Sequence, residues 1–113
     1  MKRCLVGSEM CIRDSLKHLN EKIVCVHLSA YGRQGERAAW PGYDYLMQAE
    51  CGYLAVTGEP GGPPSRMGLS LVDLSTGLQA AIALSSGILG ARASGKGGDY
   101  DVSLFDAAMA NVC

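Results

Sequence analysis

Apolar runs alternate with polar segments rich in glycine and proline along the chain, and this pattern predicts alternating strands and helices. Residues 16–22 have the pattern of a helix end followed by a polar turn. A short β-branched run at 23–28 is typical of a buried strand in a parallel sheet. Helical spacing of apolar residues predicts a helix over 43–52, and the glycines and prolines at 57–64 predict a rigid loop.

The longest predicted element is a helix over 69–90, in which apolar residues cover nearly all sides. We therefore expect this helix to be buried on nearly all sides. Gly77 and Gly87 each cost a helix about 1 kcal/mol relative to alanine. The expected reason for both glycines is the close approach of another backbone.

The last part of the chain predicts a turn at 93–98, an extended segment at 100–103 and a helix over 104–111. Strands and helices thus alternate, which is the pattern of an α/β fold.

Composition narrows the class of protein. The chain has 113 residues, a net charge of −1, 48% hydrophobic and 19% charged residues, which suits one domain or a part of one. These values exclude a disordered chain and a strongly basic nucleic-acid binder. No uninterrupted apolar run reaches the roughly 18 residues of a membrane helix, so we expect no membrane partner. Five irregularly spaced cysteines favour free thiols and a cytoplasmic location.

The first fifteen residues do not fit the rest of the chain. The stretch 10–15 is similar to a translated end of a sequencing-library adapter, so we interpret residues 1–15 as a non-native segment. The alternative is a short natural N-terminal segment. Under the first interpretation Cys4 and Cys11 have no functional role, and residues 16–113 are an internal part of a longer protein.

Two patterns suggest ligand chemistry but have simpler explanations. Residues 90–97 nearly match a phosphate-binding loop, but Gly97 stands where a serine or threonine should be. A helix also precedes this loop where a strand is required, so a helix C-cap and turn are expected. Cys25 and His27 make a poor metal pair by themselves, and we predict a core thiol, a strand-end imidazole and no metal.

Asp73 is the most informative acidic residue, because it lies in the first turn of the long apolar helix. A carboxylate beside apolar surface costs desolvation unless something requires it there. Two interpretations stay open at this point. Asp73 either has a chemical function, or it stabilises the positive end of the helix as a capping residue.

Three stretches, at 29–44, 48–64 and 95–107, have an order and spacing that resemble the class III coenzyme A (CoA) transferases. They include Ser-Ala-Tyr-Gly with Pro-Gly-Tyr-Asp, Gln-Ala-Glu-Cys-Gly with Gly-Pro-Pro, and Asp-Val-Ser-Leu-Phe-Asp-Ala. This family, also called CaiB/BaiF-like, includes formyl-CoA and carnitine-CoA transferases. The resemblance covers residues 16–113 and implies a partial Rossmann-like CoA-transferase domain with a long buried helix. It also implies an interlocked homodimer in full-length members.

The resemblance implies an enzyme whose catalytic aspartate falls at Asp73, after the Gly-Pro-Pro loop. In such enzymes the aspartate attacks the acyl-CoA carbonyl, and a mixed anhydride and then an aspartyl-CoA thioester form. CoA passes in this way from one carboxylic acid to another by covalent catalysis. The implied partners are an acyl-CoA and a carboxylic acid, with no tightly bound cofactor. We expect residues 16–113 alone to be inactive.

The remaining site residues follow from the same resemblance. Tyr43 is expected to donate a hydrogen bond to the substrate, with Asp44 beside it. Backbone groups near Gly68 and Leu74 are expected to stabilise the oxyanion of each tetrahedral intermediate. The basic residues expected to contact the CoA phosphates are Arg33, Arg37, Arg66 and Lys96.

Two alternatives remain open at this stage. The related α-methylacyl-CoA racemases have a histidine where this chain has Tyr43, and they deprotonate the carbon next to the thioester. A phenol is a poor base near neutral pH, which favours the transferase over the racemase. Tyr43 is otherwise a buried aromatic that closes a loop onto the sheet. The other alternative is a non-catalytic α/β binding module in which Asp73 is only a cap.

Overall fold

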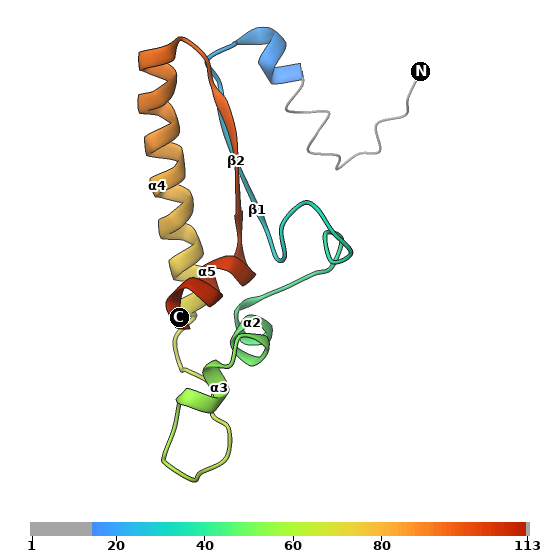
Figure 1. Ribbon diagram of the computed structural model, residues 1–113, viewed down its shortest axis with the longest axis vertical. Coiled ribbons are helices and arrows are strands. Elements are labelled where there is room, and N and C mark those ends of the chain that lie inside the picture. Colours follow the sequence, from blue (N-terminus) through green and yellow to red (C-terminus); the bar gives the residue numbers. More distant parts are fainter. Residues whose placement is uncertain (1–14, 113) are drawn as a thin grey trace.

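A computed structural model describes residues 15–112, which form a pair of strands flanked by helices (Figure 1). A short helix over 15–19 comes first. The labelled elements are β1 (Val24–Ser29), α2 (Asp44–Glu50), α3 (Tyr53–Val56), α4 (Leu71–Ser94), β2 (Gly98–Ser103) and α5 (Leu104–Val112). The α/β class predicted from the sequence is confirmed. Residues 1–14, including Cys4, Cys11 and nearly all of the segment interpreted as non-native, lie outside the described residues.

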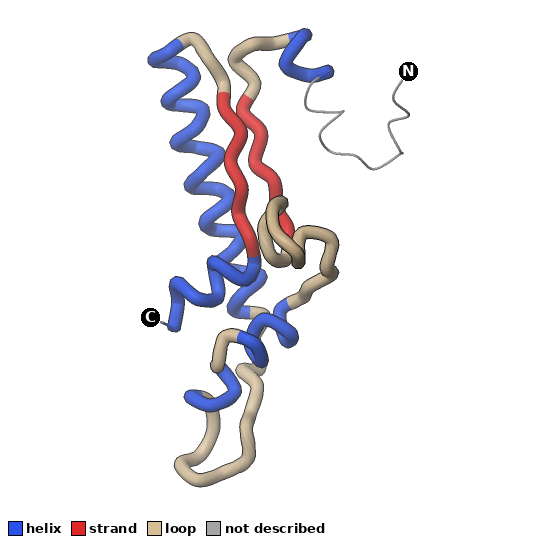
Figure 2. The backbone as a smooth tube through the Cα atoms, turned by 45° about the vertical axis from the view of Figure 1, so that its right-hand side comes forward, coloured by secondary structure: helices blue, strands red, loops and turns tan. Residues whose placement is uncertain are grey.

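The two strands are parallel neighbours along their whole length (Figure 2). Val24 lies opposite Gly98, and Ser29 lies opposite Ser103. Because parallel strands need a long crossover connection, all of α2, α3 and α4 lie between them in the chain. The carboxyl ends of β1 and β2 meet at one edge, where the loop toward α2 and the helix α5 both begin. The pairing of β1 with β2 confirms that the sheet is parallel. The larger Rossmann-like sheet stays a prediction.

Helix α4 packs along the strand pair through a glycine. A Cβ atom added to Gly87 would lie 2.6 Å from the Tyr100 ring and 2.7 Å from the Val24 side chain. Gly87 does allow a close approach, but side chains make the contact, so the expected approach of another backbone is wrong there. At Gly77 a Cβ would meet no atom of the described residues within 4 Å, so the expectation is wrong there.

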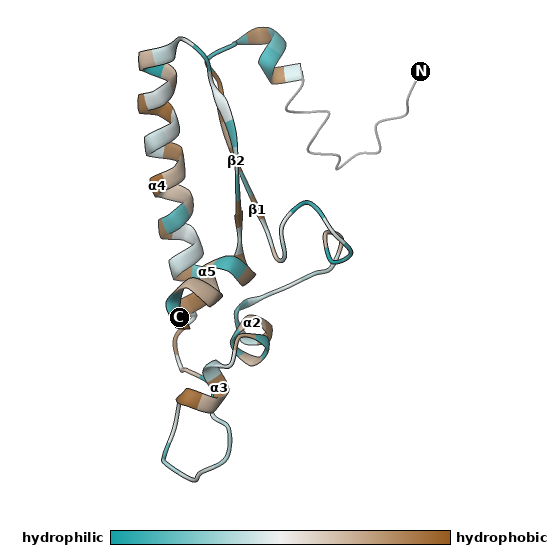
Figure 3. Ribbon diagram, in the orientation of Figure 1, coloured by the Kyte–Doolittle hydropathy of each residue, from teal (hydrophilic) through white to brown (hydrophobic). Residues whose placement is uncertain are grey.

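The expectation that α4 is buried on nearly all sides is also wrong. Its buried residues are Val72, Thr76, Gly87 and Ala91, and Leu78 on its outer face is 68% exposed. Figure 3 shows apolar residues along much of the helix, away from the strands as well as toward them. An all-round apolar helix indicates surface suited to burial. In the described residues its main contacts are with the strand pair, α2 and α5.

By length and composition alone, α4 is apolar enough to cross a membrane, and it is the one such helix among residues 15–112. The sequence does not show α4 as an uninterrupted apolar run, because polar residues occur along the helix. A single such helix is weak evidence, since the core helix of a globular protein passes the same test. The absence of a membrane partner stays a prediction.

The core lies where α2, α3 and α5 meet the first turn of α4. Its buried apolar residues are Met47, Cys51, Tyr53, Val72 and Ala108. Within it, the Tyr53 hydroxyl donates a 2.9 Å hydrogen bond to the Ala108 carbonyl oxygen. The sequence did not predict α3, which is only four residues long. This core therefore holds the first turn of α4 against α2.

Cys51 should react slowly with alkylating reagents. Both Cys25 and Cys51 are free thiols, and burial, helped by the negative charge of Glu50, raises the pKa of the Cys51 thiol. Because the thiolate is the nucleophile, we expect iodoacetamide to modify native Cys51 about tenfold more slowly than half-buried Cys25 at about pH 8. Mass spectrometry of the separate peptides measures both rates, and the rates should converge in denaturant. Equal native rates would contradict the burial of Cys51.

Candidate active site at the start of helix α4

Asp73 lies in the first turn of α4, and its side chain is exposed to solvent. The fold places this turn beside α2, at the end of α4 nearest α5 (Figure 1). The backbone N–H of Asp73 donates a hydrogen bond to Asp44 Oδ2 at 3.3 Å. The Asp73 carboxylate itself is accessible to a ligand approaching from solvent.

Asp44, at the start of α2, caps α4 from a distance in sequence. Its Oδ2 atom accepts the backbone N–H of Val72 at 2.8 Å and that of Asp73 at 3.3 Å. Ser70, the residue in the N-cap position, makes no side-chain capping hydrogen bond. Asp44 therefore supplies the side-chain capping hydrogen bonds of α4, while a favourable interaction of the Asp73 carboxylate with the positive end of the helix stays a prediction.

Helix α5 provides an internal comparison. Ser70 and Asp73 have the spacing of a capping box, and so do Ser103 and Asp106 at the start of α5. In α5 the Ser103 hydroxyl accepts the Asp106 backbone N–H at 3.0 Å and donates to the Asp106 carboxylate at 2.6 Å. The equivalent local bonds do not form in α4. The same four-residue pattern thus engages the Asp106 carboxylate in a local hydrogen bond and leaves the Asp73 carboxylate without the equivalent bond.

Gln48 completes the network around Asp44, a role that was not predicted from the sequence. Its side chain is fully buried. Gln48 Nε2 donates to Asp44 Oδ1 and to the Leu69 carbonyl oxygen, and Gln48 Oε1 accepts the Met67 N–H at 2.9 Å. The available signal was the spacing of Asp44 and Gln48, which puts two polar residues on the same face of α2 as the core residue Met47.

The structure corrects the expected oxyanion donors. The Leu74 N–H already donates to the Ser70 carbonyl oxygen at 3.0 Å, in the first hydrogen bond of the helix. The N–H groups of Val72 and Asp73 are bonded to Asp44. Gly68 differs, because it is exposed and a Cβ there would meet no described atom within 4 Å. Space for a ligand therefore exists beside Gly68, whereas the Leu74 N–H is occupied.

Tyr43 is the N-cap residue of α2 and is 61% exposed. Its ring packs edge-on against Tyr45, with ring centres 6.3 Å apart. The alternative of a buried aromatic is therefore wrong. Tyr43 directly precedes Asp44, and the Asp44 side chain is bonded to the Asp73 backbone N–H. Asp44 therefore links Tyr43 to Asp73.

The turn before Tyr43 needs a glycine. A Cβ on Gly42 would lie 2.5 Å from both Ala30 Cβ and Met47 Cε. Gly42 also lines a hollow of about 410 Å³ at the carboxyl end of β1, together with Trp40 and Leu104. Ligands of parallel sheets commonly bind beyond the carboxyl ends of the strands. The hollow and Tyr43 are therefore neighbours along the chain.

Two of the four predicted CoA contacts are already paired with carboxylates. Arg33 forms an ion pair with Asp101, including a 3.0 Å hydrogen bond. Arg37 pairs with Glu50 at 3.0 Å, and its guanidinium lies over the Trp40 ring. Either arginine would have to exchange its carboxylate for a phosphate to bind CoA.

The other two basic residues lie at opposite ends of α4. Arg66 stacks over the Tyr45 ring, 4.1 Å from its centre, on the loop that leads to Asp73. Lys96 follows the far end of α4, which a rise of 1.5 Å per residue puts about 30 Å from Asp73. Gly95 ends that helix with a left-handed φ of 76° and donates its N–H to Ala91, which confirms the expected C-cap. Arg66 therefore lies on the loop that precedes Asp73, whereas Lys96 lies beyond the other end of α4.

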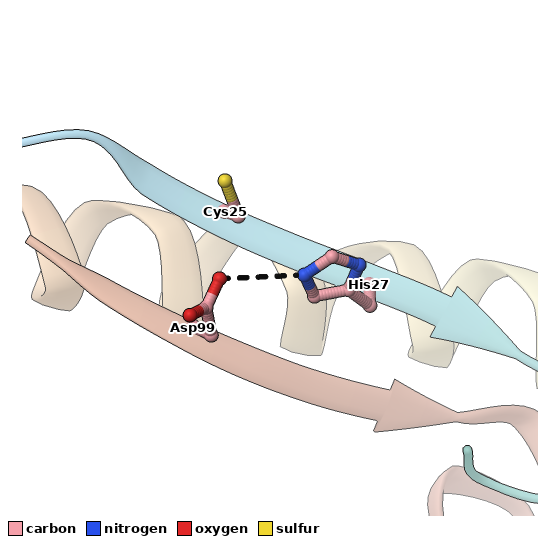
Figure 4. A group of neighbouring side chains, drawn as sticks. All are labelled: Cys25, His27 and Asp99. Carbon is pink, nitrogen blue, oxygen red and sulfur yellow. Dashed lines mark ion pairs between the residues drawn. The ribbon is translucent and has the colours of Figure 1, made fainter. Parts of the chain in front are cut away.

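A second polar cluster joins the two strands (Figure 4). Cys25, His27 and Asp99 have ligand atoms within 4.8 Å of one another. Asp99 was not predicted as a neighbour of this pair, and the register that places it opposite Cys25 brings it there. His27 Nε2 lies 3.5 Å from Asp99 Oδ1, and the Lys17 ammonium also pairs with Asp99. Asp99 thus has neighbours on β1 and on the helix that precedes β1, and the absence of a metal from this cluster stays a prediction.

Known proteins share this sequence and this fold. An acyl-CoA transferase from Fusarium pseudograminearum is 46% identical over 82% of the chain and 20% of its own length. A succinate–glutarate CoA-transferase from Agrobacterium fabrum is 34% identical over 82% of the chain and 23% of its own length. The chain thus spans about a quarter of the length of the curated relatives it matches.

Solved structures agree with the sequence relatives. A CaiB/BaiF family protein from Brucella suis matches with a TM-score of 0.83 and 32% identity, over 88% of this chain and 26% of that one. A hypothetical protein from Mycobacterium tuberculosis matches with a TM-score of 0.81 and 26% identity, over 95% of this chain and 32% of that one. The sequence model of CoA-transferase family III matches residues 11–112. The chain therefore belongs to CoA-transferase family III.

Proposed function

We propose that residues 15–112 are the nucleophile-bearing part of a longer enzyme that transfers CoA between carboxylic acids. Family membership supports this proposal, as do relatives named as succinate–glutarate and acetyl-CoA:oxalate CoA-transferases. The observation that carries it is the exposed Asp73 carboxylate. It lies at a helix start whose backbone N–H groups are already capped by Asp44. The cytoplasmic location and the interlocked homodimer are part of the same proposal.

The chemistry begins with attack of an Asp73 oxygen on the carbonyl carbon of the acyl-CoA. The carbon–sulfur bond breaks, CoA leaves as a thiolate, and a mixed anhydride forms. The thiolate then attacks the aspartyl carbonyl, the donor acid leaves as a carboxylate, and Asp73 carries CoA as a thioester. The acceptor carboxylate displaces CoA to form a second anhydride. Attack of CoA on the new acyl group finally releases the product and the free Asp73 carboxylate.

Other side chains of this segment bind and orient the reactants. The exposed hydroxyl of Tyr43 is suited to donate a hydrogen bond to a substrate oxygen. Arg66 lies on the loop before α4 and is the best placed of the four basic residues to contact a phosphate of CoA. The space beside Gly68 leaves its backbone accessible to the reacting carbonyl.

Trapping the covalent intermediate tests this function. The experiment uses the full-length polypeptide that contains residues 15–112, which we call the complete enzyme. With acyl-CoA present and no acceptor acid, hydroxylamine should convert Asp73 to its hydroxamate, since only an activated carboxyl reacts. Peptide mass spectrometry locates the modification, and omission of acyl-CoA is the control.

Other results of this experiment distinguish the alternatives. An enzyme that transfers CoA when acceptor acid is supplied, but shows no modified Asp73 in the trapping experiment, would exclude the proposed function. Deuterium uptake at the carbon next to the thioester, without trapping, would indicate a racemase. Binding of CoA without turnover, unchanged in Asp73→Asn, would indicate a non-catalytic binding module.

A further inference from the structure

The buried pair Asp44 and Gln48 joins three parts of the chain that form the proposed site. Both side chains come from α2 and are 3% and 0% exposed. Asp44 holds the first turn of α4 through the N–H groups of Val72 and Asp73. Gln48 holds the preceding loop through Met67 and Leu69. One pair of side chains therefore connects α2, the loop and the helix start.

The two side chains also depend on each other. Gln48 Nε2 donates to Asp44 Oδ1, while the other Asp44 oxygen accepts from the backbone of α4. A buried carboxylate is costly unless its oxygens are hydrogen-bonded, and both oxygens of Asp44 meet this condition. These bonds all go to protein donors, which leaves Asp44 unsuited to direct contact with a substrate.

The network links the two residues proposed to meet the substrate. Tyr43 directly precedes Asp44, and the Asp73 backbone N–H is bonded to Asp44. If the first turn of α4 rotated or moved away from α2, the hydrogen bonds from Val72 and Asp73 to Asp44 would break together. The direction of the Asp73 carboxylate relative to Tyr43 thus depends on the Asp44 carboxylate.

We infer that Asp44, locked by Gln48, is a positioning residue that orients Asp73 for attack on the thioester. This inference rests on the proposed function and replaces the expected substrate contact of Asp44. Orientation of a nucleophile affects the chemical step more than the binding of substrate, and a displacement of about 1 Å can cost about a hundredfold in rate. Its loss should therefore lower kcat and leave KM nearly unchanged.

An exchange of donor and acceptor tests this inference in the complete enzyme. In Asp44→Asn one side-chain oxygen becomes an NH₂ group. That group faces either the Gln48 NH₂ or the N–H groups of α4, which are all donors, so at least one hydrogen bond is lost in either orientation of the amide. The double variant Asp44→Asn with Gln48→Glu reverses donor and acceptor. Its asparagine oxygen accepts from Val72 and Asp73, its NH₂ donates to the new carboxylate, and that carboxylate accepts from Met67. The double variant loses the bond to Leu69, where a carboxylate oxygen then faces the carbonyl oxygen, and keeps the other bonds of the network.

We expect Asp44→Asn to lower kcat about a hundredfold, with KM for acyl-CoA changed less than about threefold. The double variant should recover kcat to within about tenfold of the original enzyme. Tyr53→Phe is the matched structural control, since it removes a buried hydrogen bond from the same core without touching α4. This control should lower the melting temperature and leave kcat unchanged.

Several results would overturn the inference. One is a kcat for Asp44→Asn within about threefold of the original enzyme while Asp73→Asn is inactive. Another is a double variant that folds but stays as slow as Asp44→Asn. If Asp44→Asn does not fold, the double variant alone decides. A folded double variant whose kcat is about a hundredfold below that of the original enzyme would overturn the inference. Activity that survives Asp73→Asn would instead exclude the proposed function, so the two failures are distinguishable.

Discussion

Asp73→Asn is expected to stop CoA transfer by the complete enzyme, with a loss of at least about a thousandfold in kcat. Asparagine has nearly the shape of aspartate, but its amide is a poor nucleophile toward a thioester. The backbone N–H at this position would still donate to Asp44, so the helix start should keep its structure. Chromatographic measurement of the acyl-CoA product gives kcat, and thermal unfolding should change little.

Asp106→Asn is the matched control for this experiment. Asp106 occupies the same position in the first turn of α5 as Asp73 does in α4, and it is also exposed. Asp106→Asn keeps the backbone bond to Ser103 and loses mainly a negative charge near the helix start, so it should cost about 0.5 kcal/mol of stability without stopping transfer. Equal kcat values for the two variants would mean that Asp73 has no chemical role.

Gly97→Ala is expected to destabilise the fold strongly, by about 3 kcal/mol or more. An added Cβ would lie 1.8 Å from the carbonyl oxygen of Ile23 and 2.6 Å from its carbonyl carbon. The Gly97 N–H also donates to the Glu21 carbonyl oxygen at 2.8 Å. Because the obstructing atoms are backbone, no side-chain rotation relieves the clash. The start of β2 would have to move away from the chain that enters β1.

Gly77→Ala is the matched comparison within α4. Its added Cβ would meet no described atom within 4 Å, and alanine favours a helix over glycine by about 1 kcal/mol. We therefore expect scanning fluorimetry of the complete enzyme to show a lower melting temperature for Gly97→Ala and a slightly higher one for Gly77→Ala. A Gly97→Ala protein as stable as the original would contradict the close contact with Ile23.

Local pattern predicted most elements because each depends on neighbours in sequence. The expected strand at 23–28 is β1 (Val24–Ser29), and the expected helix at 43–52 is α2 (Asp44–Glu50). The long helix starts within two residues of its predicted position but continues to Ser94 rather than ending at residue 90. Helix α3 was missed because four residues are too few to establish a period.

Burial and pairing could not be predicted in the same way. The apolar pattern of α4 indicates surface suited to burial, and it does not say which atoms cover that surface. The partners of Arg33 and Arg37 are Asp101 and Glu50, which the chain path brings to them. A basic residue available to a phosphate and one already paired with a carboxylate therefore look alike in sequence.

The order and spacing of residues along the chain were enough to predict the α/β class, the resemblance to the CoA-transferases and the place of Asp73 in the first turn of a helix. The packing of α2 against α4 makes Asp44, held by Gln48, the side chain that caps that helix in place of the local Ser70. The physical reason is that two acceptors compete for the same backbone N–H groups. Which acceptor prevails depends on how α2 packs against α4, through contacts between residues far apart in the chain.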